Sequence, residues 1–355
     1  MTSQDISTAQ RARLAERQTP RFSDFKDVAL PALPAVPGLV TEAECRYLYW
    51  LTSRGFTGAG AVVEVGTWLG LSSVHLAAGL RDGGFPAALH CYDQFVWRGD
   101  HARKTTLPLR RGDDFQPCFE RNVRPVYPGL KVTRSELKDL VWRGGPIEIL
   151  FLDAPKHLVD LSWALAALGP SLVPDLSLLV MQDYLHPPAY ALPAVVSRIG
   201  ERLRPLHVVQ GGSTAAFEVT RPLDFGRAQP IDWNFSRWSE AEILDGWERV
   251  AGPLPPEARV RLWVGAALLF YRRRETRRAL EIIRRVARDP EMSPHMQSET
   301  AVILYRDYRP LFRAAGIKPP PLEDRPPSGL RPAIRRARAF ARRWLRPVDV
   351  TRTIG

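Results

Sequence analysis

A glycine-containing segment at residues 64–72 has the residue types and spacing of a ligand-binding turn. Its sequence, EVGTWLGLS, continues an apolar run and leads into a stretch with helical spacing. Gly66 and Gly70 let the backbone turn sharply and let a ligand approach it closely. Ser72 is placed to cap the following helix, whose N-terminal amides would face that ligand. The G-x-x-x-G spacing differs from the G-x-G-x-x-G fingerprint of dinucleotide-binding domains, so a pyrophosphate ligand is disfavoured. The alternative to a ligand-binding turn is an ordinary strand-to-helix turn without a ligand.

An acid follows the next apolar run at the distance that a nucleoside ligand requires. Asp93 comes directly after ALHCY at 88–92, which places it 23 positions after Gly70 (93 − 70). A carboxylate about 20 residues past a glycine turn, at the carboxyl end of the second strand, suits hydrogen bonds to ribose hydroxyls. The alternative is an ordinary strand-end aspartate, but the two features in register favour a nucleoside-binding crevice.

Two more acids end later apolar runs, Asp153 after 147–152 and Asp183 after 177–181. Magnesium prefers carboxylate and water oxygens, so Asp153 and Asp183 are candidate Mg²⁺ ligands. Lys156, however, places a fixed positive charge where such a metal would sit. The metal and a metal-free site are therefore both open hypotheses.

Three basic side chains near these acids are candidates for moving a proton. The ammonium group of Lys156 would stabilise a developing alkoxide or bind an acidic substrate, or serve as a base after desolvation; a surface lysine is the alternative. His157 and His186 are rival bases, because histidine titrates near neutral pH.

Apolar runs alternate with helical stretches along residues 41–203, which predicts βαβ units and a parallel sheet covered on both faces. The strand-like runs are 61–65, 88–92, 130–132, 147–152 and 177–181, and the helical stretches are 41–54, 72–81, 114–122, 157–168 and 189–203. Two last runs, 205–210 and 215–220, are joined by a connection too short for a crossover helix. We therefore expect them to form an antiparallel hairpin.

Length and composition predict two domains with flanking segments. The chain has 355 residues, 45% of them hydrophobic and 25% charged, which excludes disorder throughout. We expect an N-terminal arm at 1–40, loose and rich in proline, and a catalytic domain at 41–222. A small helical cap at 233–315 precedes a proline-rich linker and basic tail at 316–355. Within it, residues 262–290 have the spacing of a helix pair, with apolar positions Trp263, Ala266, Ala267, Phe270, Ala279, Ile283 and Val286; a tetratricopeptide-like array is the alternative, but no second copy follows at a fixed period.

The basic charge is concentrated in the tail. Of the net +12, eight arginines and one aspartate after residue 329 contribute +7, so the charge gives no reason to expect that the body binds nucleic acid. Residues 331–346 have an apolar stripe opposite arginines, which is typical of a helix lying on anionic lipid; a solvated basic tail is the alternative. The chain has three cysteines, no secretory signal and no apolar stretch of about 18 residues, which predicts a cytoplasmic protein. If residues 331–346 do bind lipid, the protein would lie at the inner face of the membrane.

The motifs EVGTWLGLS, YDQF, LFLDAPKH and MQDY, closed by VVQGGSTAAFEV, resemble the class I S-adenosylmethionine-dependent methyltransferases. Within them the chain looks most similar to the macrocin-type and related sugar O-methyltransferases, over about residues 40–220. The resemblance implies an α/β fold with a doubly wound, seven-stranded, mostly parallel sheet, whose last strand is antiparallel, followed here by a C-terminal helical region. It also implies S-adenosylmethionine as the methyl donor.

The resemblance also implies roles for individual residues. The donor would lie over Gly66, Thr67 and Gly70, near Ser72 and Asp153, with its ribose on Asp93. Glu64 would hold its methionine end or order the turn, and Ser135 and Glu136 would contact adenine. The family commonly shows D-G-D-H after the fourth strand, whereas Pro155 and Lys156 stand at the positions of its second acid and histidine. This departure puts the Mg²⁺ site in doubt.

These observations predict an S-adenosylmethionine-dependent O-methyltransferase that acts on a small molecule or glycan, most simply a sugar hydroxyl. Lys156, His157 and Asp183 are its candidate catalytic residues, and Asp153 and Asp183 its candidate metal ligands. A catalytically inactive scaffold with the same fold is the alternative, and a homo-oligomer is compatible with either. A nucleic-acid methyltransferase is disfavoured because the base-flipping signature is absent.

Overall fold

The computed structural model describes residues 7–98, 101, 105–225, 237–297 and 313–316. The chain divides into two compact units, Met1–Pro255 and Pro256–Gly355. This division differs from the expected cap at 233–315, because helix α7 (Glu240–Ala251) belongs to the first unit. The reason is close packing on helix α6 (Ala191–Ile199): a Cβ atom at Gly246 would lie 2.9 Å from the Cβ of Ser197.

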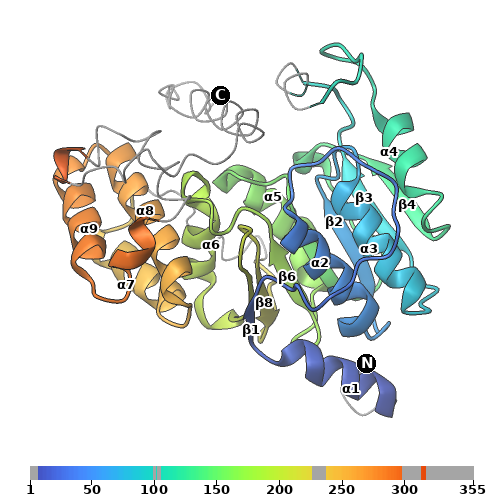
Figure 1. The fold of residues 1–355 in the computed structure, drawn as a ribbon, viewed down its shortest axis with the longest axis horizontal. Helices are drawn as coiled ribbons and strands as arrows, with labels where there is room; N and C mark the ends of the chain where they lie inside the picture. The colour runs from blue at the N-terminus through green and yellow to red at the C-terminus, as the bar shows by residue number, and fades with distance from the viewer. Residues whose placement is uncertain (1–6, 99–100, 102–104, 226–236, 298–312, 317–355) are drawn as a thin grey trace. The chain divides into compact units, whose positions relative to one another are not determined.

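The first unit is built on one eight-stranded sheet with the order β1-β7-β8-β6-β5-β2-β3-β4 (Figure 1). Its strands are β1 (Arg21–Ser23), β2 (Ala61–Val65), β3 (Leu89–Asp93), β4 (Leu130–Arg134), β5 (Ile147–Leu152), β6 (Leu178–Met181), β7 (Leu203–Val209) and β8 (Ala215–Val219). Strand β8 pairs antiparallel with β6 and β7, and every other pairing is parallel. The predicted α/β fold and terminal hairpin are confirmed, with one strand more than the seven expected.

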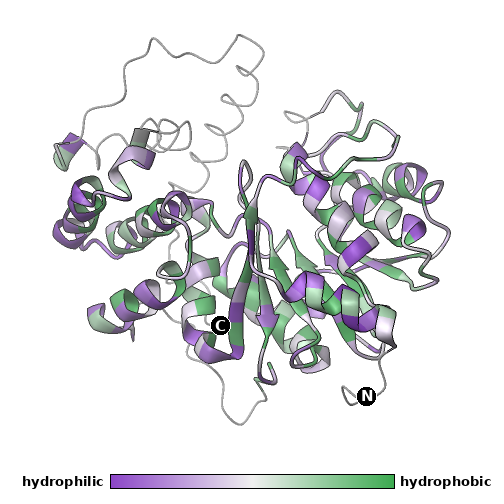
Figure 2. Cartoon of the chain, turned by 60° about the horizontal axis from the view of Figure 1, so that its bottom comes forward, coloured by the Kyte–Doolittle hydropathy of each residue, from purple (hydrophilic) through white to green (hydrophobic). Residues whose placement is uncertain are grey.

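Helices cover both faces of this sheet (Figure 1). One face carries α2 (Glu42–Trp50), α3 (Leu71–Asp82) and α4 (Gln116–Val123), and the other carries α5 (Leu158–Leu168) and α6. Because both faces are covered, every residue of β5 is buried, and the strands are mostly hydrophobic in Figure 2. Short helical turns complete the unit: η1 (Leu51–Gly55), η3 (Leu137–Asp139), η4 (Gly169–Ser171), η5 (Pro187–Ala189) and η6 (Gly200–Arg202).

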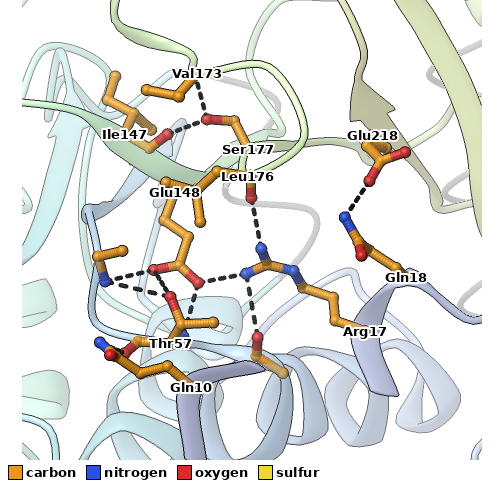
Figure 3. Close-up of polar contacts among 12 residues, drawn as sticks. Gln10, Arg17, Gln18, Thr57, Ile147, Glu148, Val173, Leu176, Ser177 and Glu218 are labelled. Carbon is orange, nitrogen blue, oxygen red and sulfur yellow. Dashed lines mark hydrogen bonds and ion pairs between the residues drawn. The ribbon is translucent and has the colours of Figure 1, made fainter. Parts of the chain in front are cut away.

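The expectation of a loose N-terminal arm is wrong for residues 8–23. Helix α1 (Thr8–Gln18) begins at a Ser7–Gln10 capping box, and β1 extends the sheet beside β7. The buried Arg17 guanidinium pairs with Glu148, near the start of β5, and also donates to the carbonyl groups of Gly55 and Leu176 (Figure 3). This buried ion pair fastens α1 to the sheet, because either charge alone would be costly to bury.

The second unit contains helices α8 (Pro256–Arg272) and α9 (Thr276–Arg288) and the turn η8 (Ser293–Gln297) among its described residues. The apolar positions predicted for a helix pair are all buried: Trp263, Ala266, Ala267, Phe270, Ala279, Ile283 and Val286. The Arg285 guanidinium lies 4.6 Å from the centre of the Trp263 ring. No described helix is long and apolar enough to cross a membrane. The expected tail helix at 331–346 lies outside the described residues.

Candidate active site

The carboxyl ends of four parallel strands lie in register at one edge of the sheet. Val65 of β2 is level with Tyr92 of β3 and Leu152 of β5, and Leu152 is level with Met181 of β6. The chain leaves β2 toward β3 on one side and leaves β5 toward β6 on the other. Such a switch point is where doubly wound sheets form a ligand crevice, so the side chains that follow these strands gather there.

The glycine turn after β2 packs directly against the loop after β5. Gly66 and Gly70 have φ values of +92° and +95°, the left-handed region that favours glycine. A Cβ atom at Gly66 would lie 2.4 Å from the backbone nitrogen of Ala154, and one at Gly70 would lie 2.7 Å from the side chain of Val123 in α4. Both glycines are therefore required by the packing of the chain itself, which brings the turn and Asp153 together.

Glu64 is a fully buried carboxylate that holds the start of α3. It accepts hydrogen bonds from the hydroxyl groups of Ser72 and Ser73, the latter at 2.6 Å. Burial raises the pKa of Glu64 to about 7, against the effect of these hydroxyls. Ser72 was expected to cap α3, but the N-cap is Gly70, and Ser72 sits inside the helix with its hydroxyl turned to Glu64. The arrangement supports a turn-ordering role for Glu64.

Asp93 is oriented by the backbone around it. Its carboxylate accepts hydrogen bonds from the amides of Trp68 at 3.0 Å and Phe95 at 2.9 Å, and both donors have left-handed φ values, 43° and 54°. Burial raises its pKa, which these amides oppose. Each carboxylate oxygen has a second lone pair, so the group has capacity for ribose hydroxyls.

The two residues expected at adenine lie just after β4. The backbone amide of Ser135 donates to the carbonyl of Asp93 at 2.9 Å, so Ser135 lies beside Asp93 at the carboxyl edge of the sheet. The Glu136 side chain is exposed and pairs with Lys138 at 3.0 Å. Their predicted contact with adenine stays a prediction.

A group of aromatic side chains beside Asp93 is a feature that the sequence analysis missed. Trp68 stacks on Trp97 at a centroid distance of 6.4 Å, and His101 and Phe115 pack edge-on against Trp97 at 4.9 and 5.9 Å. Within the described part of the chain, the buried Trp97 Nε1 and the buried Thr67 Oγ1 have no hydrogen-bond partner. Buried polar atoms without a partner are uncommon in folded proteins.

Lys156 lies between the two carboxylates that were predicted to bind a metal. Its Nζ is 3.0 Å from Asp153 Oδ1 and 3.1 Å from Asp183 Oδ2. It also donates to the side-chain oxygen of Gln182 at 2.5 Å and to the Gln182 carbonyl at 3.2 Å. The structure thus brings together Asp153, Lys156 and Asp183, and adds Gln182, which the sequence analysis did not single out.

The charges in this group stabilise one another. Burial raises the pKa of Asp153 despite the nearby Lys156. Burial acts in the same direction on Asp183, but the positive charges of Lys156 and His186 lower its pKa to about 2. For Lys156, burial disfavours the charged form, but the two aspartates outweigh it and raise its pKa. Lys156 is therefore a cation at neutral pH, which favours electrostatic stabilisation over a role as a base.

A second set of polar residues fixes Asp183 from behind. Its Oδ1 accepts a hydrogen bond from Ser213 at 3.1 Å, and the Ser213 amide donates to Glu44 at 2.8 Å. Glu44 also accepts from the Thr214 hydroxyl at 2.7 Å and closes a capping box with Thr41. The only sequence signals for this network are the T-x-x-E capping box and the polar hairpin turn.

The charges of the two candidate histidines act on different carboxylates. His157 is exposed at the N-terminus of α5, and its charge acts on Asp160, whose pKa is raised by burial. His186 is half-buried, and its charge acts on Asp183. Their predicted roles as rival bases stay predictions.

The residues present do not fit the predicted Mg²⁺ site. Among the described residues, no group of three or more His, Cys, Asp or Glu side chains is placed to hold a metal ion. The point between Asp153 and Asp183 is filled by the Lys156 ammonium group. Magnesium needs several oxygen ligands at close range, and here the available oxygens are hydrogen-bonded to a lysine.

Comparison with known proteins identifies the class of the domain. Residues 63–184, about a third of the chain, match the family model of a methyltransferase domain. This segment runs from β2 to the end of β6 and includes the glycine turn, Asp93 and the Lys156 group. The match indicates a methyltransferase domain in this segment of the chain. A search of curated proteins found no match.

Several solved structures are similar at low identity. CalS11, a TDP-rhamnose 3'-O-methyltransferase of calicheamicin biosynthesis, is 13% identical over 49% of this chain and 76% of its own, with a TM-score of 0.35. Cofactor-bound Rv0187 from MTB is 18% identical over 61% and 92%, with a TM-score of 0.33. A TehB-like S-adenosylmethionine-dependent methyltransferase from Corynebacterium glutamicum is 13% identical over 49% and 87%, with a TM-score of 0.32. Scores this low carry no argument about activity or acceptor.

Proposed function

We propose that this protein transfers the methyl group of S-adenosylmethionine to a hydroxyl oxygen of a sugar or glycan. The observation that carries the proposal is the contact between the two halves of the crevice. The glycine turn and Asp93 form the donor side, and Asp153 and Lys156 form the other side, where Ala154 packs against Gly66. An acceptor that reaches Asp153 would therefore lie next to the donor.

The chain's own residues have distinct tasks in this proposal. The bound donor supplies an activated methyl group on its sulfonium, so the protein mainly positions the reactants. Asp93 and the turn at 66–70 hold the donor, and Lys156 stabilises negative charge as it develops on the acceptor oxygen. Asp153, with a side chain 29% exposed against 14% for Lys156, is the group that an acceptor can reach to deliver its proton. The oxygen–methyl bond forms as the sulfur–methyl bond breaks.

The choice of a sugar or glycan rests on the sequence resemblance and on polar groups near the crevice. Asp160 lies in the first turn of α5, where burial raises its pKa and the positive charges of His157 and Arg98 oppose this rise. Charged groups of both signs suit an acceptor rich in hydroxyls, which can donate and accept hydrogen bonds.

The test measures donor binding and transfer separately. We expect calorimetry to detect binding of S-adenosylmethionine by the full chain, and isotope-labelled methyl groups to appear on members of a panel of nucleotide sugars and oligosaccharides. Donor binding without transfer to any acceptor would favour the inactive scaffold. Transfer only to non-sugar hydroxyls would refute the sugar acceptor, and tight binding of NAD with none of the methyl donor would refute the function as a whole.

A further inference from the structure

We propose that the ammonium group of Lys156 is the resident cation of this site, standing where a divalent metal would otherwise bind, so that the protein works without a metal. The catalytic part of this statement rests on the proposed function, whereas the cation-site part rests on geometry alone. It assigns a role to a lysine that lies three residues after a strand-end aspartate, Asp153.

The first argument is the number and kind of atoms around the lysine. The three N–H groups of the ammonium match three side-chain oxygens, one each from Asp153, Asp183 and Gln182, at 3.0, 3.1 and 2.5 Å. The Gln182 carbonyl adds a fourth oxygen at 3.2 Å. Carboxylate, amide and carbonyl oxygens are also what a hard divalent cation selects, so Lys156 occupies a ready-made oxygen cage.

The second argument is that the fold holds these oxygens in place independently of Lys156. Asp183 has a left-handed φ of 64° and accepts from Ser213, which is itself bound to Glu44. Gln182 is 6% exposed, and its backbone amide donates to the carbonyl of Leu152 at 3.0 Å, which fixes the position of this residue at the end of β6. Removing the lysine side chain would therefore leave an oxygen cage with two negative charges rather than a collapsed site.

The third argument is charge. With Lys156 present, the two aspartates and one ammonium sum to −1; without it they sum to −2. A divalent ion placed between the same carboxylates would lie within a few ångströms of the ammonium and be repelled by it. Lys156 and a divalent metal therefore exclude each other from this site. Because Lys156 is covalently part of the protein, it is always present there.

The experiment measures Mn²⁺ binding to the full chain by electron paramagnetic resonance and calorimetry, which needs neither donor nor acceptor. Unaltered protein should show no stoichiometric Mn²⁺ site. Lys156→Met should bind one Mn²⁺ at least about tenfold more tightly than the unaltered protein, because the cage then carries two uncompensated charges. Adding Asp153→Asn to that variant should abolish the acquired site. Lys138→Met removes an exposed lysine beside Glu136 and should behave as the unaltered chain.

Two outcomes would overturn the inference. One is that the unaltered protein binds Mn²⁺ stoichiometrically and that Asp153→Asn abolishes this binding. Such a result would show that a metal displaces Lys156 from the site, and it can be obtained without a Lys156 variant. The other is a folded Lys156→Met protein that acquires no site. Circular dichroism of each variant reports folding, and donor binding by the unaltered chain, measured by calorimetry, tests the proposed function separately. Failure to bind the donor would refute that function and leave the Mn²⁺ result decisive for the cation site.

Discussion

Replacing Glu64 with glutamine should make the first unit more stable at alkaline pH, although it changes a residue inside the family motif. The carboxylate is fully buried, and two serine hydroxyls are its main partners. A glutamine of the same shape can accept from one hydroxyl with its oxygen and donate to the other with its amide. The substitution Glu64→Gln therefore removes a buried charge and keeps a hydrogen-bond partner for each serine hydroxyl.

The magnitude follows from the pKa of Glu64. Burial raises it from the ordinary 4.5 to about 7. The folded state then binds the proton more tightly than the unfolded state, so the contribution of Glu64 to stability is full below about pH 4.5 and is lost as the pH rises through about 7. At about 1.4 kcal/mol per pH unit, this interval corresponds to about 3 kcal/mol.

The assay is urea unfolding followed by circular dichroism at several pH values between 4.5 and 8, for the unaltered chain and the variant. We expect the free energy of unfolding of Glu64→Gln to exceed that of the unaltered protein by about 3 kcal/mol at pH 8 and to converge with it near pH 4.5. Taking the difference cancels the other titrating groups. The exposed Glu136, changed to glutamine, should shift stability by less than about 0.5 kcal/mol at every pH. A difference for Glu64→Gln that does not depend on pH would refute the reasoning.

Three other predictions test the donor site, the N-terminal helix and the tail. Asp93→Ala should weaken S-adenosylmethionine binding by about 1.5–3 kcal/mol in calorimetry, the scale of lost charge-assisted hydrogen bonds, and an unchanged affinity would contradict the ribose contact. Arg17→Met should lower the free energy of unfolding measured in urea by about 3–5 kcal/mol, because Glu148 is left buried without its counter-charge. Adding Glu148→Gln to this variant should recover part of the loss. An equal loss in the single and the double variant would argue against the ion pair. In sedimentation with anionic liposomes at low salt, the full chain should pellet and a chain ending at Ser328 should not; equal recovery of both in the supernatant would reject membrane docking by the tail.

Most of the sheet could be predicted because its signal is local. Apolar runs of strand length separated by helical stretches located seven of the eight strands, and a connection of four residues required the hairpin of β7 and β8. The carboxyl-edge positions of Gly66, Asp93, Asp153 and Asp183 followed from the same pattern, because parallel strands end at one edge.

The parts that could not be predicted depend on contacts between residues far apart in the chain. Strand β1 has three residues, too few for a periodic pattern, and its partner β7 lies much later in the sequence. The Arg17–Glu148 pair spans 131 positions, and the Glu44–Ser213 contact spans 169. One sequence gives residue types but not such pairings, so an arginine in an apparently loose arm carries no sign of burial.

The metal hypothesis shows a different kind of limit. Two strand-end aspartates indicate an oxygen-rich site, and that part is correct, since both carboxylates converge on one point. Which cation occupies the point depends on where a long, flexible lysine side chain turns. A lysine can extend into solvent or toward nearby carboxylates, and the structure shows that Lys156 turns inward, because its ammonium group contacts Asp153, Asp183 and Gln182.

Strand β5 links the N-terminal helix to the chemistry of the crevice. Near its start, Glu148 pairs with Arg17 of α1, and just after its end, Asp153 pairs with Lys156. Every residue of the strand is buried, so it cannot slide without disturbing the core on both faces. The approach of Ala154 to Gly66 leaves no space for even one additional carbon atom. The glycine turn and the Asp153–Lys156 pair are therefore positioned by one continuous piece of packed structure, whose other end is fastened to α1 by the buried Arg17–Glu148 pair.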